Sequence, residues 1–267
     1  MNVYRRIEGF LDPGRHGPAI AALDGDIGAI LAAVRGLLVH DAHLDLYGVT
    51  EADCDTVSRA TLPVAARLDR LMARADRPLG QARPPGLRDV GTCRDFALLT
   101  CAFLRRHDVA VRVRCGFARY FTPGRLEDHW ICEYRPTGPP WARADAQPDE
   151  AHRRHLGIAF DPADLPDDAF LTADEAWRAY RAGAIVAEAC GHGADGGVWF
   201  LWVNLARDHL ALRDRLTSDW DSRRESASNP PHLDAAWLAR GDALAALIGA
   251  ATDASGMGDP PFALAPF

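Results

Sequence analysis

The chain has 267 residues, of which 48% are hydrophobic and 25% are charged. These values are ordinary for a globular protein, and the length allows one large domain or two small ones. The formal net charge of −7 excludes the overall positive field that draws a protein to nucleic acid or to anionic lipid. The longest apolar runs, such as the one at 243–251, are too short to cross a bilayer. We therefore expect no nucleic-acid partner and no membrane association.

Six cysteines are scattered without a CxxC pair, at positions 54, 93, 101, 115, 132 and 190. This spacing argues against a disulfide framework and against a zinc ribbon. The N-terminal residues lack an apolar stretch of the length that a secretion signal needs. We expect a protein of the reducing cytoplasm, and the sequence indicates neither a metal site nor a cofactor site.

The first 74 residues are expected to be mainly helical. Residues 24–40 carry apolar side chains at helical spacing behind an Asp-rich start, and a second helix is predicted at 57–73, entered or interrupted at Pro63. The next stretch, 74–90, is rich in Pro, Gly and Arg, which predicts an ordered loop.

The middle of the chain has the clearest pattern. Residues 94–107 contain no Gly or Pro and are apolar almost all round, which predicts a helix buried on most sides. Residues 111–121 alternate between apolar and charged side chains, as a strand does. Two short β-prone segments, 129–134 and 141–145, are joined by a Pro- and Gly-rich connection that predicts a hairpin. A helix followed by three consecutive strands favours an α+β fold over a wound parallel sheet.

Beyond residue 148 the pattern is weaker. Thr172 and Glu175 have the spacing of a capping box at the start of a helix. Residues 198–216 predict a largely apolar helix, or a strand followed by a helix, and the glycine-rich stretch 191–197 predicts a loop. Neither a repeat nor a domain boundary is evident.

Cys93 follows Gly91 and Thr92 at the start of the predicted buried helix. A thiol at a helix N-terminus is close to unpaired backbone N–H groups, whose partial positive charge stabilises the thiolate and lowers the pKa of the thiol. The same N–H groups can bind the oxyanion of a tetrahedral intermediate. Position alone leaves a second interpretation open, a small buried hydrophobic residue, which is what most free cysteines are.

In the predicted hairpin, a loop over 135–139 places Tyr134 opposite Pro140, and His129 then lies opposite Asp145. Directly paired residues have their Cβ atoms about 4.5–5.5 Å apart on one face of the sheet. Asp145 can therefore accept a hydrogen bond from one ring nitrogen of His129 and leave the other nitrogen for a thiol. In the alternative interpretation both polar side chains merely face solvent, and a register slip of one residue would put them on opposite faces.

Four ordered segments, GTCRDFALL, VRVRCGFARYF, DHWICEY and WARADAQ, together resemble the transglutaminase-like superfamily. The resemblance covers about residues 88–148, and the flanking phrases RPLGQARPPGLRDVGTCRDF and FLTADEAWRAYRAG are similar to a bacterial subgroup of it. It implies a papain-like fold with a Cys-His-Asp triad, carried over here onto Cys93, His129 and Asp145. The resemblance ends after Gly183.

This resemblance gives an expected organisation. We expect a single transglutaminase-like domain over residues 1–267 with a catalytic core at about 75–150. A helical N-terminal part at 1–74 and a C-terminal extension at 151–267 complete it.

Three further residues are weaker candidates around the expected site. Gln81 could donate to the oxyanion, as a glutamine upstream of the cysteine does in papain-like proteases, although prolines separate it from Cys93. Asp128 is an alternative partner for His129, but it points to the opposite face if the strand has already begun. Trp130 is more often a core residue beside a catalytic histidine than a recognition residue.

The expected activity is acyl transfer through a thioacyl enzyme. The donor would be a peptide, a small amide or a carrier-protein thioester, and the acceptor would be water or an amine, which covers peptidase, amidase, transamidase and amide synthase activity. A catalytically silent binding module on the same fold is the alternative. A metal or redox protein built on Cys93, Cys115, Cys132 and His129 is disfavoured, because these residues lack the pair spacing of zinc ligands.

Overall fold

The structure is a computed structural model that describes residues 3–50, 53, 63–135, 138, 140–193, 195–216, 233–251, 257–260 and 262. Helices and strands both occur along these residues, and the larger sheet contains antiparallel as well as parallel pairs, so the predicted α+β class is confirmed. The chain forms two compact units: unit 1 comprises Met1–Val113 and Ile131–Leu165, and unit 2 comprises Arg114–Trp130 and Pro166–Phe267. The expected core at 75–150 contributes residues to both.

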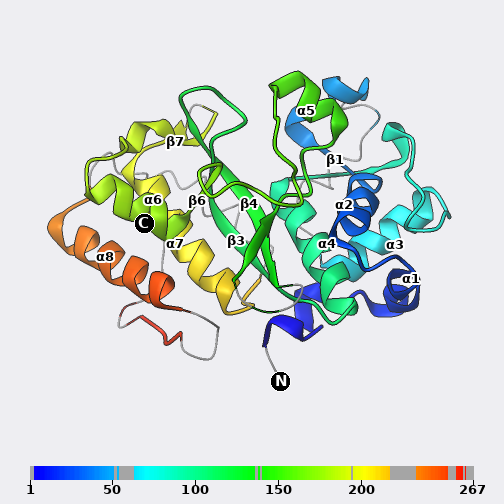
Figure 1. Ribbon diagram of the computed structural model, residues 1–267, viewed down its shortest axis with the longest axis horizontal. Coiled ribbons are helices and arrows are strands. Elements are labelled where there is room, and N and C mark those ends of the chain that lie inside the picture. Colours follow the sequence, from blue (N-terminus) through cyan, green and yellow to red (C-terminus); the bar gives the residue numbers. More distant parts are fainter. Residues whose placement is uncertain are drawn as a thin grey trace. The chain divides into compact units, whose positions relative to one another are not determined.

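Unit 1 is built around one buried helix. Its helices are α1 (Gly17–Ala21), α2 (Ile27–Arg35), α3 (Val64–Arg74), α4 (Cys93–Arg106) and α5 (Glu150–Leu156). Helices α1, α2 and α3 all contact α4, as Figure 1 shows. Almost every residue of α4 after Cys93 is buried, which confirms the helix that the sequence predicts at 94–107. Its aliphatic and aromatic side chains form the core of the unit.

Two separate strand pairs complete unit 1. Strand β1 (Leu38–His40) pairs in parallel with β2 (Asp89–Gly91). Strand β5 (Ala142–Ala144) pairs antiparallel with β4 (Leu126–Arg135), which confirms the predicted hairpin.

The N-terminal predictions are partly wrong. The sequence predicts one helix over 24–40, but α2 ends at Arg35 and the chain continues as strand β1. Leu38 and Val39 are buried where β1 pairs with β2, and not along a face of the helix. Gly36 permits the exit, since a Cβ there would lie 2.8 Å from the Cα of Ala82. Helix α3 begins directly after Pro63, as expected, whereas 57–62 lie outside the described residues. The predicted loop at 74–90 ends in β2.

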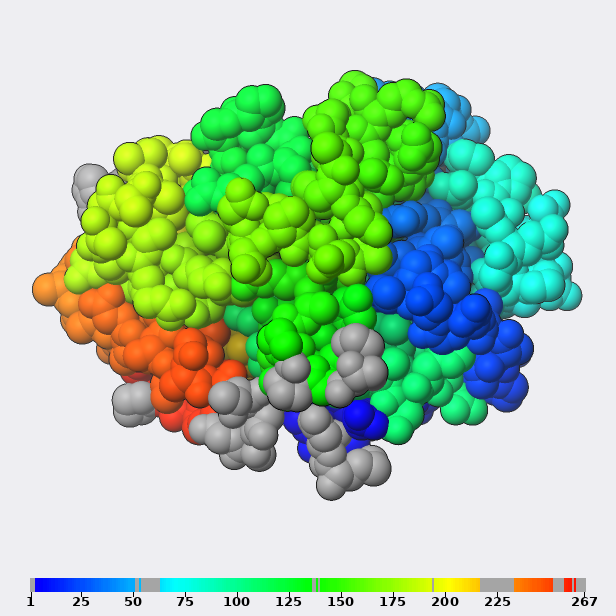
Figure 2. Space-filling view, in the orientation of Figure 1, coloured from blue at the N-terminus to red at the C-terminus, as the bar shows by residue number. Residues whose placement is uncertain are grey.

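Unit 2 combines a sheet with three packed helices. Its strand order is β6-β3-β4-β7-β8, with β3 at Ala110–Ala118, β6 at Phe170–Thr172, β7 at Cys190–His192 and β8 at Asp195–Gly196. The helices are α6 (Ala173–Arg181), α7 (Val198–Leu212) and α8 (Ala235–Ala250). They pack on one another, and Figure 2 shows the yellow-green surface of α6 beside the orange surface of α8.

The close approach of α6 and α8 depends on a glycine. A Cβ at Gly241 would lie 2.1 Å from the Trp177 ring, so only glycine fits here without a shift of the helices. The indole Nε1 of Trp177 donates to Asp242 at 2.9 Å.

Three C-terminal predictions can be compared with the structure. The capping box of Thr172 and Glu175 is present at the start of α6, and α7 is an apolar helix. The glycine-rich stretch predicted as a loop contributes to the short antiparallel pair of β7 and β8. Helix α5, in the polar segment after residue 148, was not predicted.

Candidate active site

The start of α4 is fixed by a capping box and a buried arginine. Thr92 accepts from the N–H of Asp95 at the third helical position, and the Asp95 carboxylate accepts from the N–H of Thr92 at 2.8 Å. Arg67 of α3 donates to Asp95 at 2.7 Å and to Asp89 at 2.7 Å, and all three side chains are buried. The segment between β2 and α4 is therefore held in place, and Asp95 has a structural role in it.

Cys93 is the first residue of this helix and is half-buried, whereas the other four described cysteines are buried. The Cys132 thiol donates to the carbonyl of Ala97 at 3.1 Å, and burial raises its pKa well above the usual value. Burial likewise raises the pKa of Cys190 to about 12, against the opposing charges of Arg119 and Arg125. Among the described cysteines, Cys93 thus combines access to solvent with a helix N-terminus.

His40 is the imidazole that contacts Cys93 in unit 1. The parallel register of β1 and β2 sets His40 beside Gly91, two residues before Cys93, and the two side chains are hydrogen-bonded. Phe96, on the first turns of α4, stacks on the His40 ring with 6.4 Å between centroids. A histidine from a distant strand therefore lies at the N-terminus of α4.

The charge state of His40 follows from its neighbours. Burial disfavours the imidazolium, but hydrogen bonds with Asp41 and with Cys93, and their negative charges, outweigh burial and raise the pKa of His40 to about 9. Nδ1 of His40 lies 3.1 Å from the backbone nitrogen of Ala42, and it can accept that hydrogen bond only when it is unprotonated. Nδ1 also lies 3.2 Å from the Asp41 carboxylate, to which it can donate only when it is protonated. The raised pKa favours the ion pair with Asp41. Near neutral pH, His40 is a cation beside the thiol.

A second group of polar rings continues from His40. The His43 ring lies 5.4 Å from His40 and 4.9 Å from His152, and burial together with these two imidazoles lowers the pKa of His43 to about 4. The Tyr47 hydroxyl donates to Asp149 at 2.8 Å and lies 2.8 Å from Nδ1 of His152. His43 is therefore neutral at pH 7 while His40 is charged.

Asp145 also belongs to unit 1 and is 1% exposed. Its carboxylate accepts from the N–H of Gln147 at 2.8 Å, and its own N–H donates to the carbonyl of Pro162 at 2.8 Å. Arg35 donates to the backbone carbonyls of Asp145 and Ala146 at 3.2 and 3.1 Å. The backbone around Asp145 is therefore fixed on both sides.

The predicted register of the hairpin is wrong by two residues. Tyr134 pairs with Ala142 rather than with Pro140. Proline has no N–H and cannot donate to the ladder, so pairing begins beyond it. Continued at the same register, Asp145 would face Ile131, so the direct opposition of His129 and Asp145 on which we relied does not hold. The triad assignment itself stays a prediction.

His129 lies in the part of β4 that belongs to unit 2, and it is 2% exposed. Its ring packs edgewise against Phe121 at 4.8 Å, Tyr120 at 5.9 Å and Phe170 at 6.5 Å between centroids. These aromatic rings restrict the orientations of the imidazole.

The weaker candidates have distinct environments. Two residues of α7 fix the side chain of Asp128. Asn204 donates to its carboxylate at 2.8 Å, and Arg207 lies 3.6 Å from the same carboxylate. Trp130 is 3% exposed, which confirms it as a core residue. The side chain of Gln81 is exposed, in the turn closed by its N–H and the carbonyl of Pro78.

Sequence reasoning did not identify His40. The His-Asp pair directly after a buried apolar run was the available signal, but the run was assigned to a helix. Only the pairing of β1 with β2 brings His40 to Cys93.

Within the described ranges, His, Cys, Asp and Glu side chains form no group of three or more that could hold a metal ion, and no helix could cross a lipid bilayer. Comparison with known proteins found no matching family model and no significant match among curated proteins or solved structures.

Proposed function

We propose that the chain is a cysteine-dependent acyl-transfer enzyme with a papain-like core, and that Cys93 is its nucleophile. The observation that carries this proposal is the pair formed by Cys93 and His40. A half-buried thiol at the N-terminus of a 14-residue helix is hydrogen-bonded to a buried imidazole whose pKa is raised to about 9. Such a pair favours thiolate and imidazolium over thiol and imidazole, which activates the sulfur at neutral pH.

In the first step, the Cys93 thiolate attacks the carbonyl carbon of an amide or thioester. The carbonyl electrons move to oxygen, and the N–H groups of the first turn of α4 are the available donors to that oxyanion. When the intermediate collapses, the bond to the amine or thiol breaks and an imidazolium supplies the proton that the leaving group takes. A thioacyl enzyme remains.

In the second step, water or an amine attacks the thioacyl carbon while an imidazole removes its proton. The carbon–sulfur bond breaks and the Cys93 thiolate is restored. Water gives a carboxylic acid, and an amine gives a new amide, so one site can serve as hydrolase or transamidase.

Two histidines share the imidazole roles in this proposal. His129 is the proton-transferring base and Asp145 its partner, as the resemblance to the transglutaminase-like superfamily implies for this sequence. We assign to His40 a separate role, the cation that stabilises the resting thiolate, because its imidazole interacts with Cys93 within unit 1 and has a raised pKa.

Intact-mass spectrometry tests the proposal. The protein is incubated with a panel of small acyl thioesters and amides and quenched in acid, and adducts are located by peptide mapping. We expect one acyl group on Cys93 and none on the buried Cys101, Cys115, Cys132 and Cys190, and no adduct in Cys93→Ala. Acylation of another cysteine, or none from any thioester although Cys93 reacts with iodoacetamide, would contradict the proposal.

A further inference from the structure

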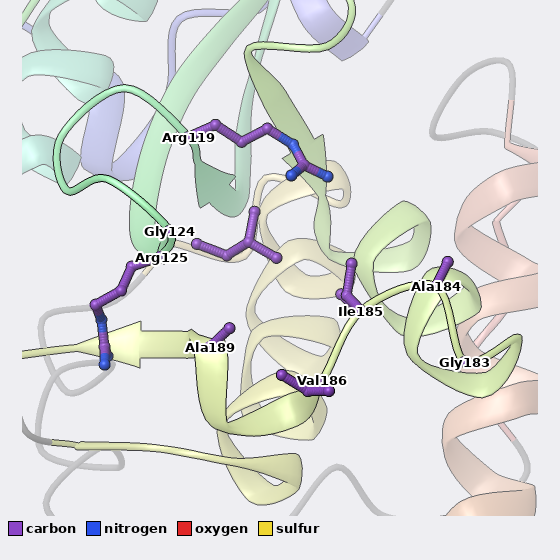
Figure 3. Close-up of a pocket in the computed structure, with 9 residues that line it drawn as sticks. Arg119, Gly124, Arg125, Gly183, Ala184, Ile185, Val186 and Ala189 are labelled. Carbon is purple, nitrogen blue, oxygen red and sulfur yellow. The ribbon is translucent and has the colours of Figure 1, made fainter.

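A pocket in unit 2 lies at a distance in sequence from the cysteine helix. It has a volume of about 410 Å³, within the range of small-molecule sites. The loop between β3 and β4 supplies one wall, and the segment between α6 and β7 supplies the other (Figure 3). The lining residues are Arg119, Gly124, Arg125, Leu126, Gly183, Ala184, Ile185, Val186 and Ala189.

The two charged groups of the pocket are both arginines. The guanidinium of Arg119 is exposed and makes no hydrogen bond or ion pair with any residue that the structure describes. Arg125 approaches Glu127, with 3.4 Å between Nε and the carboxylate, but its Nη2 is buried and has no hydrogen-bond partner within the described ranges. A buried donor without a partner is costly, so the Arg125 side chain is suited to an acceptor from outside the chain.

The positive charges of Arg119 and Arg125 both act on Cys190. Arg119 and Arg125 each lower the pKa of Cys190, the first residue of β7, against the larger effect of its burial. Glu188, the acidic neighbour that also acts on Cys190, lines an adjoining pocket that shares Gly183, Ile185 and Val186 with this one. The lining of the arginine pocket contains no acidic residue.

The walls between the arginines are apolar. Figure 3 shows the two guanidinium groups well apart, and Leu126, Ile185 and Ala189 are among the apolar residues that line the pocket with them. Leu126 is 4% exposed, whereas Val186 is 64% exposed, a large value for an aliphatic side chain. Both side chains add apolar surface to the lining of the pocket.

We propose that this pocket binds a small organic molecule with an anionic group at each end, with one carboxylate or phosphate on Arg119, one on Arg125, and a short hydrocarbon segment against Leu126 and Ile185. Arginine is suited to both head groups, because its planar fork donates two parallel hydrogen bonds to either. Two separated cations favour a ligand charged at both ends over one charged at a single end. The proposal is independent of acyl transfer at Cys93.

Isothermal titration calorimetry with heptanedioate and heptanoate tests this site. These probes share a chain length and differ in the second carboxylate. We expect heptanedioate to bind roughly tenfold or more tighter than heptanoate, and the advantage to shrink as salt is raised. Arg119→Gln and Arg125→Gln should each remove that advantage. Heptane-1,7-bisphosphate replaces heptanedioate in a parallel arm, which identifies the preferred head group.

Arg154→Gln is the matched control, because it removes one positive charge from an exposed side chain of α5 whose ion-pair partner among the described residues is Glu150. It should bind as the parent protein does. Melting curves confirm that each variant is folded. Equal affinity for heptanoate and heptanedioate, or unchanged binding of heptanedioate and of heptane-1,7-bisphosphate in both arginine variants, would overturn the proposal. Measurement in Cys93→Ala should give the same affinities, which separates this site from the proposed activity.

Discussion

The side chain of His40 is hydrogen-bonded to that of Cys93. The contact depends on the parallel register of β1 and β2, which pairs His40 with Gly91. The Asp41 carboxylate lies 3.2 Å from Nδ1 of the same ring. His40 thus interacts with both a carboxylate and a thiol near the N-terminus of α4, and all three residues belong to unit 1.

Alkylation kinetics should show the influence of His40 on Cys93. We expect iodoacetamide to modify Cys93 first and to react at pH 6 far faster than with an ordinary thiol of pKa about 8.5. His40→Gln removes the cation, so the midpoint of the rate against pH should move up toward that value. The rates are followed by mass spectrometry of the labelled peptides. If a buried cysteine is modified first, or if His40→Gln leaves the profile unchanged, the thiolate pair is not present.

The stability of the protein should also depend on His40. Its pKa is raised from 6.5 to about 9 in the folded state. The imidazolium therefore contributes stability that is fully present below pH 6.5 and is lost as the pH rises through about 9. The shift corresponds to an upper limit on the order of 3 kcal/mol. Urea unfolding of the parent and of His40→Gln should differ most at pH 6 and least at pH 10.

Asp41→Asn is the companion variant for that measurement. It removes the carboxylate that is the first of the groups raising the pKa of His40. The pH at which the stabilisation disappears should therefore move down from about 9, with the protein still folded at neutral pH. A stability difference between parent and His40→Gln that is constant from pH 6 to pH 10 would contradict the assigned protonation.

Arg67 should be a stability residue and not a substrate residue. It is 1% exposed and bridges the buried carboxylates of Asp89 and Asp95. Arg67→Met would leave two buried negative charges without this partner, which costs about 3–5 kcal/mol. Arg74→Met, in the last turn of α3, removes a half-buried guanidinium whose partners within the described ranges are the backbone carbonyls of Asp53 and Gly86, and it should cost far less. Denaturant midpoints compare the two, and similar losses would contradict the bridging role.

Local features of the sequence were sufficient to predict α4 and the start of α6. Residues 94–107 contain no helix breaker and are apolar on nearly every side, while Thr172 and Glu175 provide a cap that depends on neighbouring residues alone. Cys93 could be proposed from its place before α4. Cys93 is half-buried, whereas the other four described cysteines are buried, and this difference is consistent with that choice.

Features that depend on a distant partner could not be predicted. Strand β1 has three residues, and its apolar run fits a helix as well as a strand until β2 is placed beside it. The hairpin register depended on where pairing resumes after Pro140. Asp128 looked like a possible partner for His129, and its contacts with Asn204 and Arg207 of α7 were not visible in the sequence.

The last prediction compares two buried aspartates. Asp145→Asn should keep the fold, because the amide oxygen can still accept from the N–H of Gln147. If Asp145 is the partner of the catalytic imidazole, this change favours the wrong tautomer and should lower kcat roughly 10²–10⁴-fold, by analogy with triad hydrolases. His129→Ala should cost at least as much, and the double variant should add little, because residues that act as one unit are not additive.

Asp128→Asn is the matched control, since it makes the same chemical change one residue from His129. Its amide would keep the hydrogen bond from Asn204 but lose the charge that faces Arg207, so we expect a stability loss of about 1–3 kcal/mol with kcat largely retained. The measurements are urea unfolding and steady-state kinetics with a thioester that acylates Cys93. A large fall in kcat for Asp128→Asn with no effect of Asp145→Asn would reverse the two roles. Asp128, held in place by α7, would then be the residue that orients the histidine.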